Sequence, residues 1–183
     1  MEHKKYIIAF VGHACTGKSA AARALAEKAS DIYLVSTDKQ KWLLSGYDRN
    51  THPVPIKEIT FGLFKAVCKT GLPIQLEYIR TKEDYFACRR VAKKFGYELF
   101  VFEFLAPLPV LLERFHARVA DAKATGKKIS ITTEEVFLQN IQKGYYAPSN
   151  AMRFDTTQVS TEEIVAKVID RLGSDFTHIE LQP

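Results

Sequence analysis

The sequence predicts an α/β fold in which helices cover both faces of an open, five-stranded parallel sheet, giving a three-layer α/β/α sandwich. Two observations predict it. Five short apolar segments alternate with segments of helical character, and the first of them runs through a glycine-rich turn straight into an alanine-rich helix. A chain of 183 residues with 46% hydrophobic content can bury one substantial core. We therefore expect a single domain over residues 1–183.

The elements of the first third follow from apolar runs and from the residues that interrupt them. Residues 6–11 form an unbroken apolar run, which is typical of a buried parallel strand, and the alanine-rich segment 18–29 has high helix propensity. A second apolar run, at 32–35, precedes a short helix that ends near Gly46. Glycine, aspartate, asparagine and two prolines then predict a loop over 47–55.

The middle of the chain repeats this alternation twice. Apolar residues recur every four positions at 59–67, which predicts a helix, and a third strand follows at 73–78. Residues 83–95 carry an apolar face that includes Phe86 and Cys88, so they predict another helix. Gly96 can adopt the left-handed conformation of a helix C-cap, and a fourth strand is expected at 99–104.

The last third contains three helices and the fifth strand. A helix with an apolar stripe covers 108–119 and gives way to a polar stretch at 123–128. Two segments, 132–135 and 160–163, have the S/T-x-x-E pattern in which side chains satisfy unpaired backbone groups at a helix start. They predict one helix on each side of a strand at 152–155.

The composition limits the classes of function. A net charge of +5 comes from scattered lysines and arginines, which suits a polyanionic ligand such as a nucleotide or, equally, solvated helix faces. Cys15, Cys68 and Cys88 have no spacing typical of a disulfide framework, so a reducing, cytoplasmic location is expected. The five histidines have no metal-site spacing, and any metal should arrive with a nucleotide. No apolar run is long enough for a membrane span, so no membrane partner is expected.

The stretch GHACTGKS follows the first strand and fits G-x-x-x-x-G-K-[ST] at every fixed position. Its glycines let successive backbone N–H groups point inward, and the following helix adds its positive end, so the loop can hold phosphates. Lys18 can reach the β- and γ-phosphates and Ser19 can bind Mg²⁺. The alternative is a glycine-rich turn without a ligand. The residues expected to contact the nucleotide are Gly12, His13, Ala14, Cys15, Thr16, Gly17, Lys18, Ser19 and Ala20.

The second strand ends in Ser36-Thr37-Asp38, which places a carboxylate at the same edge of the sheet. Phosphoryl transfer to a hydroxyl needs a group that orients or deprotonates the acceptor, and Asp38 can supply it. The competing interpretation is that Thr37 or Asp38 only caps the next helix. The two roles are compatible with each other.

GHACTGKS, the STD after the second strand and the later run LAPLPVLLERFHAR resemble the P-loop kinases, which include polynucleotide 5′-hydroxyl kinases, zeta-toxin-like enzymes and kinases of the gluconate and shikimate kind. The resemblance implies a P-loop NTPase fold like that of nucleoside-monophosphate kinases, with a small helical lid. It also implies ATP- and Mg²⁺-dependent transfer of phosphate to a hydroxyl of a small-molecule, nucleoside or nucleotide-like acceptor. A polynucleotide 5′ end as acceptor, and a nucleotide-binding or NTP-hydrolysing regulatory module that is no kinase, are the alternatives.

The resemblance assigns roles on the acceptor side. Asp38 would engage the acceptor hydroxyl, and Lys41 stands where many members have an arginine. A lysine keeps the charge but lacks the planar fork of an arginine. Glu77 would hold magnesium through water, where most members have aspartate, or else serve a structural role paired with Arg80. Arg80 is expected to contact the acceptor together with Asp38 and Lys41.

The resemblance also places a lid around residues 114–132. Arg114 and Arg118 lie four positions apart, hence on one helix face, and would close over ATP and neutralise the transferring phosphoryl group. The alternative is that both are ordinary solvated arginines. In related kinases the loop after the fifth strand, here at 153–157, borders the adenine. Nothing in the sequence decides between a monomer and a homodimer.

Overall fold

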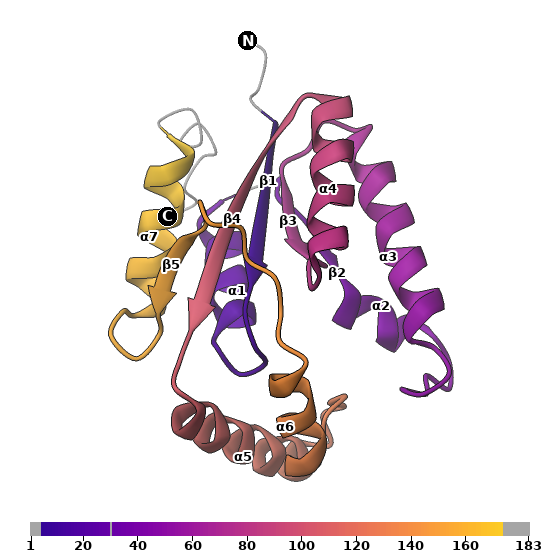
Figure 1. Cartoon of the computed structure of the whole chain (residues 1–183), viewed down its shortest axis with the longest axis vertical. Helices are drawn as coiled ribbons and strands as arrows, with labels where there is room; N and C mark the ends of the chain where they lie inside the picture. The colour runs from indigo at the N-terminus through magenta and orange to yellow at the C-terminus, as the bar shows by residue number, and fades with distance from the viewer. Residues whose placement is uncertain (1–4, 30, 174–183) are drawn as a thin grey trace.

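The computed structural model describes residues 5–29 and 31–173, and it confirms the predicted α/β sandwich. Five parallel strands form one sheet in the order β2-β3-β1-β4-β5 (Figure 1). The strands are β1 (Lys5–Val11), β2 (Tyr33–Ser36), β3 (Ile74–Glu77), β4 (Tyr97–Leu105) and β5 (Met152–Asp155). The helices are α1 (Lys18–Lys28), α2 (Thr37–Leu43), α3 (Pro53–Cys68), α4 (Lys82–Phe95), α5 (Leu108–Thr125), α6 (Glu134–Gln142) and α7 (Thr161–Leu172).

Strand β1 lies at the centre of the sheet and packs on both faces. Its alternating side chains explain the two outer layers, because Tyr6, Ile8 and Phe10 join the cluster under α1 and α7. Ile7 and Val11 join the cluster under α3 and α4 on the opposite face. Figure 1 shows these two helix pairs on the two sides of the sheet. An apolar run buried on both faces is therefore what fixes β1 in the middle.

Helices α5 and α6 form a separate unit beyond the carboxyl ends of β4 and β5 (Figure 1), and we call residues 108–142 the α5–α6 cap. Its own small core contains Phe115 and Phe137, whose rings stack with centroids 4.5 Å apart. Ala14 and Cys15, from the loop after β1, pack against this core. The α5–α6 cap thus packs directly on the loop that the sequence predicts to bind phosphate.

Three sequence-based details were wrong. Helix α3 begins at Pro53, inside the predicted loop 47–55, because proline lacks only an N–H that the first helical turn does not use. The N-cap of α6 is Thr133, which accepts a hydrogen bond from the N–H of Val136, and Thr132 lies outside the helix. Phe86 points outward on α4 with 37% of its surface exposed, whereas Cys88 is fully buried as predicted.

Other local predictions were confirmed. Thr81 and Asp84 form a capping box at the start of α4, and Ser160 and Glu163 form another at the start of α7. Gly96 ends α4 with a φ of 72°. None of the helices in residues 5–29 and 31–173 is long and apolar enough to cross a membrane.

Candidate functional site

The loop that joins β1 to α1, residues 12–19, is here called the phosphate loop. Gly17 has a φ of 92° and precedes the first residue of α1. Within the loop, the Thr16 hydroxyl donates to the carbonyl oxygen of His13 over 2.8 Å. Among the described residues, the backbone N–H groups of Gly17, Lys18 and Ser19, at the start of α1, donate to no backbone carbonyl group. Inward-curled, unpaired donors at a helix start form a binding site for an anion such as a phosphate group.

Gly12 is the tightest point of the phosphate loop. Its φ is 141°, and a Cβ atom built there would lie 2.4 Å from the carbonyl oxygen of Phe104 in β4. Neither backbone segment can move without disturbing the central strand pair, because β1 and β4 are in register from Lys5 to Val11. The close approach explains why only glycine fits at this position.

We predict that Gly12→Ala lowers the free energy of unfolding by about 1–3 kcal/mol, through the clash and the strained φ, and abolishes nucleotide binding. Denaturant unfolding and titration with AMPPNP, a non-hydrolysable analogue of ATP, measure the two effects. Gly62→Ala is the matched control, because a Cβ at Gly62 in α3 meets no atom within 4 Å. The control should be neutral or stabilising, and equal stability of the two variants would contradict the prediction.

Lys18, the first residue of α1, points back over the phosphate loop. Its ammonium group donates to the carbonyl oxygens of Gly12, over 3.0 Å, and of His13. Burial lowers the pKa of Lys18 to about 8, although the carboxylates of Glu77 and Asp38 partly offset this effect. A lysine held this way can reach phosphate oxygens bound in the loop.

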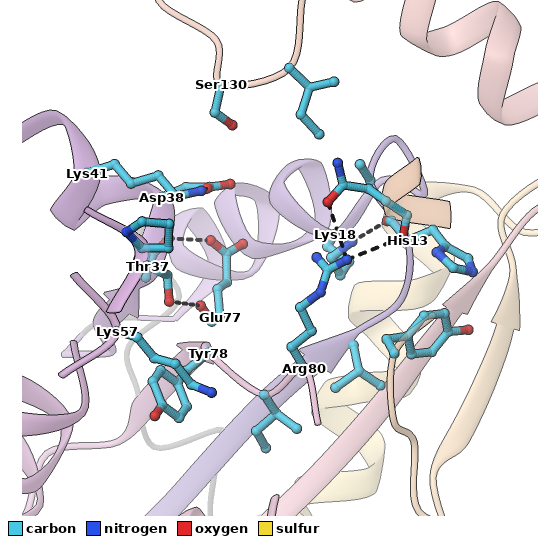
Figure 2. A pocket seen from close by; sticks show the side chains of 18 of the residues that line it. His13, Lys18, Thr37, Asp38, Lys41, Lys57, Glu77, Tyr78, Arg80 and Ser130 are labelled. Atoms are coloured by element: carbon cyan, nitrogen blue, oxygen red, sulfur yellow. Dashed lines mark hydrogen bonds and ion pairs between the residues drawn. The ribbon is translucent and has the colours of Figure 1, made fainter. Parts of the chain in front are cut away.

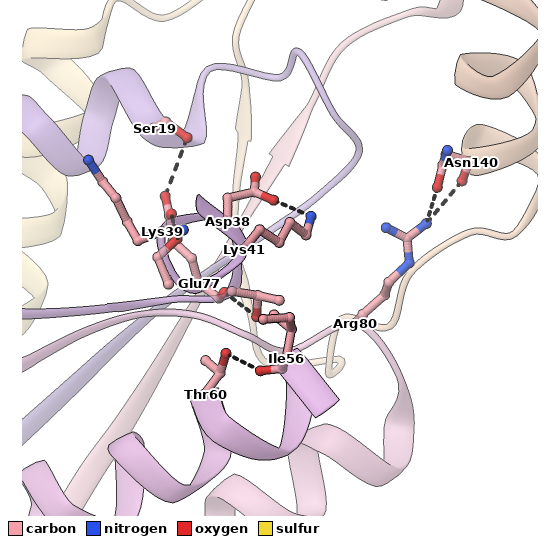
Figure 3. A network of polar contacts seen from close by, with 11 residues as sticks. Ser19, Asp38, Lys39, Lys41, Ile56, Thr60, Glu77, Arg80 and Asn140 are labelled. Atoms are coloured by element: carbon pink, nitrogen blue, oxygen red, sulfur yellow. Dashed lines mark hydrogen bonds and ion pairs between the residues drawn. The ribbon is translucent and has the colours of Figure 1, made fainter. Parts of the chain in front are cut away.

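Glu77, the last residue of β3, accepts hydrogen bonds from two hydroxyl groups, one in the first turn of α1 and one at the end of β2 (Figure 3). The Ser36 hydroxyl donates to its Oε2 over 2.7 Å, and the Ser19 hydroxyl donates to its Oε1 over 3.4 Å. The alternative pairing of Glu77 with Arg80 is not found among the described residues, where Arg80 binds Asn140 instead. Glu77 therefore lies beside Ser19, as the resemblance implied.

These oxygens fit a magnesium ion. The hydroxyl of Ser19 and the carboxylate of Glu77 are hard oxygen donors, which Mg²⁺ prefers, and Mg²⁺ usually keeps several waters and takes further ligands from phosphates. Within residues 5–29 and 31–173, no group of three or more His, Cys, Asp or Glu side chains could hold a metal ion alone. Ser19 would bind the ion directly and Glu77 through water, with the remaining ligands supplied by the nucleotide.

We predict that Glu77→Gln raises the Mg²⁺ concentration needed for half-maximal nucleotide-dependent activity by about 10- to 100-fold, since outer-shell partners of metal ligands contribute that much affinity. A Mg²⁺ titration at saturating ATP measures the shift. Glu58→Gln, on the exposed surface of α3, serves as the control. An unchanged Mg²⁺ requirement in the Glu77 variant would remove this residue from the metal site.

Asp38 lies in the first turn of α2, and it does not cap the helix. The N-cap is Ser36, whose hydroxyl accepts from the N–H of Lys39, so the interpretation of Thr37 or Asp38 as the cap was wrong. The Asp38 carboxylate is 64% exposed and pairs with the ammonium group of Lys41 one turn later. The walls of the cleft desolvate this carboxylate and so raise its pKa, but the charges of Lys41, Arg118 and Lys18 outweigh the effect and hold the pKa below its usual value. Asp38 is thus ionised at neutral pH.

The two arginines of α5 lie in different places. Arg118 lines the cleft, and its charge helps to lower the pKa of Asp38. Arg114 instead donates from its guanidinium group to the hydroxyl and carbonyl oxygens of Thr156, over 2.8 and 2.9 Å, and to the carbonyl oxygen of Cys15 over 3.4 Å. It joins the α5–α6 cap to the phosphate loop and to the loop after β5. These contacts do not support the prediction that Arg114 closes over the phosphates.

All of these groups meet in one cleft of about 680 Å³ (Figure 2). Its lining includes the sequence-predicted residues Gly12, His13, Ala14, Lys18, Ser19, Asp38, Lys41, Glu77, Arg80 and Arg118. Figure 2 shows Asp38 and Lys41 on one side, His13, Lys18 and Arg80 on the other, and Glu77 between them. Cys15, Thr16, Gly17, Ala20 and Arg114 do not line it. The predicted lid contributes Ser130 and Ile131 besides Arg118.

Several lining residues carry no motif and were missed in the sequence. Arg49 comes from the loop before α3, Lys57 from α3, and Asn140, Lys143 and Tyr145 from α6 and the segment after it. Tyr145 meets the ring of His13 edge to face with centroids 4.6 Å apart. Burial, with the charges of Lys18 and Arg80, lowers the pKa of His13, so this ring is neutral at pH 7. Arg49 and Lys143 are basic residues that lie far from any motif in the sequence. The sequence therefore did not predict that they line the cleft.

No family model and no curated protein sequence matches the chain. Solved structures do. A candidate kinase from Chloroflexus aurantiacus superposes with a TM-score of 0.70 at 19% identity, covering 90% of this chain and 97% of that one. The Mycobacterium tuberculosis APS kinase in complex with AMPPNP and APS gives 0.66 at 19% identity, covering 93% and 99%. An unliganded sugar kinase from Janibacter sp. gives 0.56 at 12% identity, covering 92% and 94%. The chain therefore shares the α/β/α fold of these kinases, and the sequence predicted that fold.

Proposed function

We propose that the protein is an ATP- and magnesium-dependent kinase that transfers the γ-phosphoryl group to a hydroxyl of a small-molecule, nucleoside or nucleotide-like acceptor. One observation carries this proposal: Lys18 and the ionised Asp38 face the same cleft from opposite sides. A switch or a purely binding module needs the first of these groups but has no use for the second. The APS kinase of similar fold, which was solved with AMPPNP, an ATP analogue, supports ATP as the donor.

The phosphate loop and its neighbours would bind the donor. The unpaired N–H groups of residues 17–19 would hold the β-phosphate, while the Lys18 ammonium would turn from the carbonyl oxygens of Gly12 and His13 to the phosphate oxygens. Ser19 and Glu77 would hold the magnesium ion. The ion, when bound, neutralises charge on the β- and γ-phosphate oxygens. Arg114, through its contacts to Cys15 and Thr156, would keep the loop after β5 in place beside the nucleotide base.

The transfer step would exchange one P–O bond for another. The acceptor oxygen attacks the γ-phosphorus in line with the bond between that phosphorus and the β-phosphate oxygen. This bond breaks, and the β-phosphate oxygen leaves as part of ADP. The hydroxyl proton passes to the carboxylate of Asp38, for which Lys41 fixes the position by pairing with Oδ1. Arg118, which also lines the cleft, would stabilise the negative charge on the transferring group.

Incubation with ATP labelled in the γ-phosphate tests the proposal. The purified protein is screened against nucleosides, 5′-hydroxyl oligonucleotides, sugars and nucleotide sugars. A labelled small molecule is the expected product, a labelled oligonucleotide would establish a polynucleotide kinase instead, and release of free phosphate with every acceptor would favour an NTP-hydrolysing regulatory module.

The cytoplasmic location stays a prediction, supported by the free thiols of Cys15, Cys68 and Cys88.

A further inference from the structure

The cleft has many more basic than acidic side chains. Seven lysines and arginines line it, against three carboxylates, which leaves an excess of four positive charges. The basic residues are Lys18, Lys41, Arg49, Lys57, Arg80, Arg118 and Lys143, and the carboxylates are Asp38, Glu77 and Asp84. Gathering like charges in a concave site is unfavourable unless a ligand of opposite charge binds there.

Two of the basic residues are neutralised within the protein. Lys41 pairs with Asp38, and the Lys57 ammonium lies 2.6 Å from Oδ1 of the buried Asp84. In the proposed function, the charges of Lys18 and Arg118 stabilise the phosphates of the nucleotide donor. The three remaining positive charges, on Arg49, Arg80 and Lys143, have no assigned partner.

Arg49 is presented by an ordered turn. The Asp48 carboxylate accepts from the backbone N–H groups of Asn50 and Thr51, over 2.9 and 3.0 Å, and the Asp48 N–H donates to Nδ1 of His52 over 2.8 Å. This pattern fixes the loop between α2 and α3. Because the Asp48 carboxylate accepts these backbone hydrogen bonds, it does not neutralise the charge of the neighbouring Arg49. No ion pair of the Arg49 side chain is found in the described part of the chain.

The guanidinium group of Arg80 is held in place by a neutral partner, Asn140. Its backbone N–H donates to Oδ2 of Asp84 over 3.1 Å, and its guanidinium group donates to the carbonyl and side-chain oxygens of Asn140, over 3.3 and 3.5 Å (Figure 3). A guanidinium group bound to an amide keeps its full charge. Asn140 lies in α6 and Lys143 follows that helix directly, so the cap brings a second basic residue to the side of the cleft that Arg80 occupies.

We propose that the phosphoryl acceptor carries an anionic group, a phosphate, a sulfate or a carboxylate, in addition to its hydroxyl, and that Arg49, Arg80 and Lys143 bind this group. The inference rests on the proposed function and narrows its substrate class. Arginine suits all three anions, because its planar fork can donate two parallel hydrogen bonds to any of them. Asp38 would then meet the hydroxyl while the basic residues hold the other end of the molecule.

Kinase assays on matched acceptor pairs test the inference. Each pair differs only in the anion: nucleoside monophosphate and nucleoside, sugar phosphate or sugar sulfate and sugar, hydroxy acid and its amide. The anionic member of the preferred pair should have a kcat/KM about 100-fold higher, which is the contribution of one or two charge-assisted hydrogen bonds. The best pair identifies the anion. Labelled product with a preference for neutral members would overturn the inference while leaving the proposed kinase function intact.

Variants of the basic residues sharpen the test. Arg49→Gln and Lys143→Gln should each raise the KM for the anionic member about 10-fold, leave kcat/KM for the neutral member unchanged, and leave the affinity for AMPPNP unchanged. Arg23→Gln, an exposed arginine of α1 outside the cleft, is the matched control. An equal loss for both members of the pair would mean that the residues act on the fold and do not recognise an anion.

A binding measurement keeps the inference testable if no acceptor is phosphorylated. The protein is saturated with AMPPNP and Mg²⁺ and titrated calorimetrically with inorganic phosphate, sulfate or acetate at constant ionic strength. Binding of an anion that weakens in Arg49→Gln and persists in Arg23→Gln would support the anion site, even though the kinase function had failed. Absence of binding, or equal binding by both variants, would overturn it.

Discussion

Asp38→Asn should lower the turnover number by about 10²- to 10⁴-fold, because asparagine can neither accept the hydroxyl proton nor carry the charge that orients the acceptor. The affinity for AMPPNP should barely change, since no atom of the phosphate loop bonds to Asp38. Asp38 has no structural role that would confuse the result, because Ser36 caps α2 and the Asp38 side chain is 64% exposed. Within residues 5–29 and 31–173, its carboxylate pairs with Lys41 alone. Steady-state kinetics and AMPPNP titration measure the two quantities.

The control for this variant is Asp170→Asn, an exposed aspartate of α7. Its turnover should match that of the unaltered protein. If Asp38→Asn retained full turnover, the assigned role would be wrong and the non-kinase alternatives would gain weight. If it lost AMPPNP affinity as much as turnover, Asp38 would act on the donor and not on the acceptor.

The fold was predictable because its signals are local and mutually consistent. The apolar run of β1, buried on both faces, can only be a central strand, and the glycines of the phosphate loop can only be a turn that approaches another backbone. The start of α3 was missed for the same local reason. Proline is common both in loops and in the first turn of a helix, and the neighbouring residues of the sequence do not distinguish these two positions.

The meeting of the phosphate loop, Glu77 and Asp38 in one cleft was also predictable, since all three stand at the carboxyl ends of strands that share one edge of the sheet. The contribution of Arg49 and Lys143 was not. Arg49 and Lys143 reach the cleft from a loop and from the end of α6, and their positions depend on how α3 and the α5–α6 cap pack. Arg114 and Arg118 illustrate the same limit. Four-residue spacing places both on one face of α5, but only tertiary contacts reveal that Arg114 binds Thr156 while Arg118 faces the cleft.

Lys18→Ala should abolish transferase activity, with a loss of about 10³-fold or more, and weaken AMPPNP binding, because it removes the one charge that the phosphate loop itself contributes. Lys28→Ala, at the other end of the same helix, is the matched control and should leave both quantities unchanged. Circular dichroism should report the same helix content for both variants. Unaltered transferase and ATPase rates in Lys18→Ala would contradict the whole assignment of the site.

The pH dependence gives a second signature of Lys18. Burial lowers the pKa of this lysine to about 8 in the free protein, and bound phosphates favour the charged form, so binding should raise the pKa again. The charged form predominates well below pH 8, makes up half of the population near pH 8, and is lost as the pH rises further. The affinity for AMPPNP should therefore be constant from pH 7 to about 7.5 and fall by up to about tenfold per unit above pH 8. Because alanine does not titrate, the Lys18→Ala variant should lose this dependence, whereas an unchanged profile in that variant would assign the titration to another group.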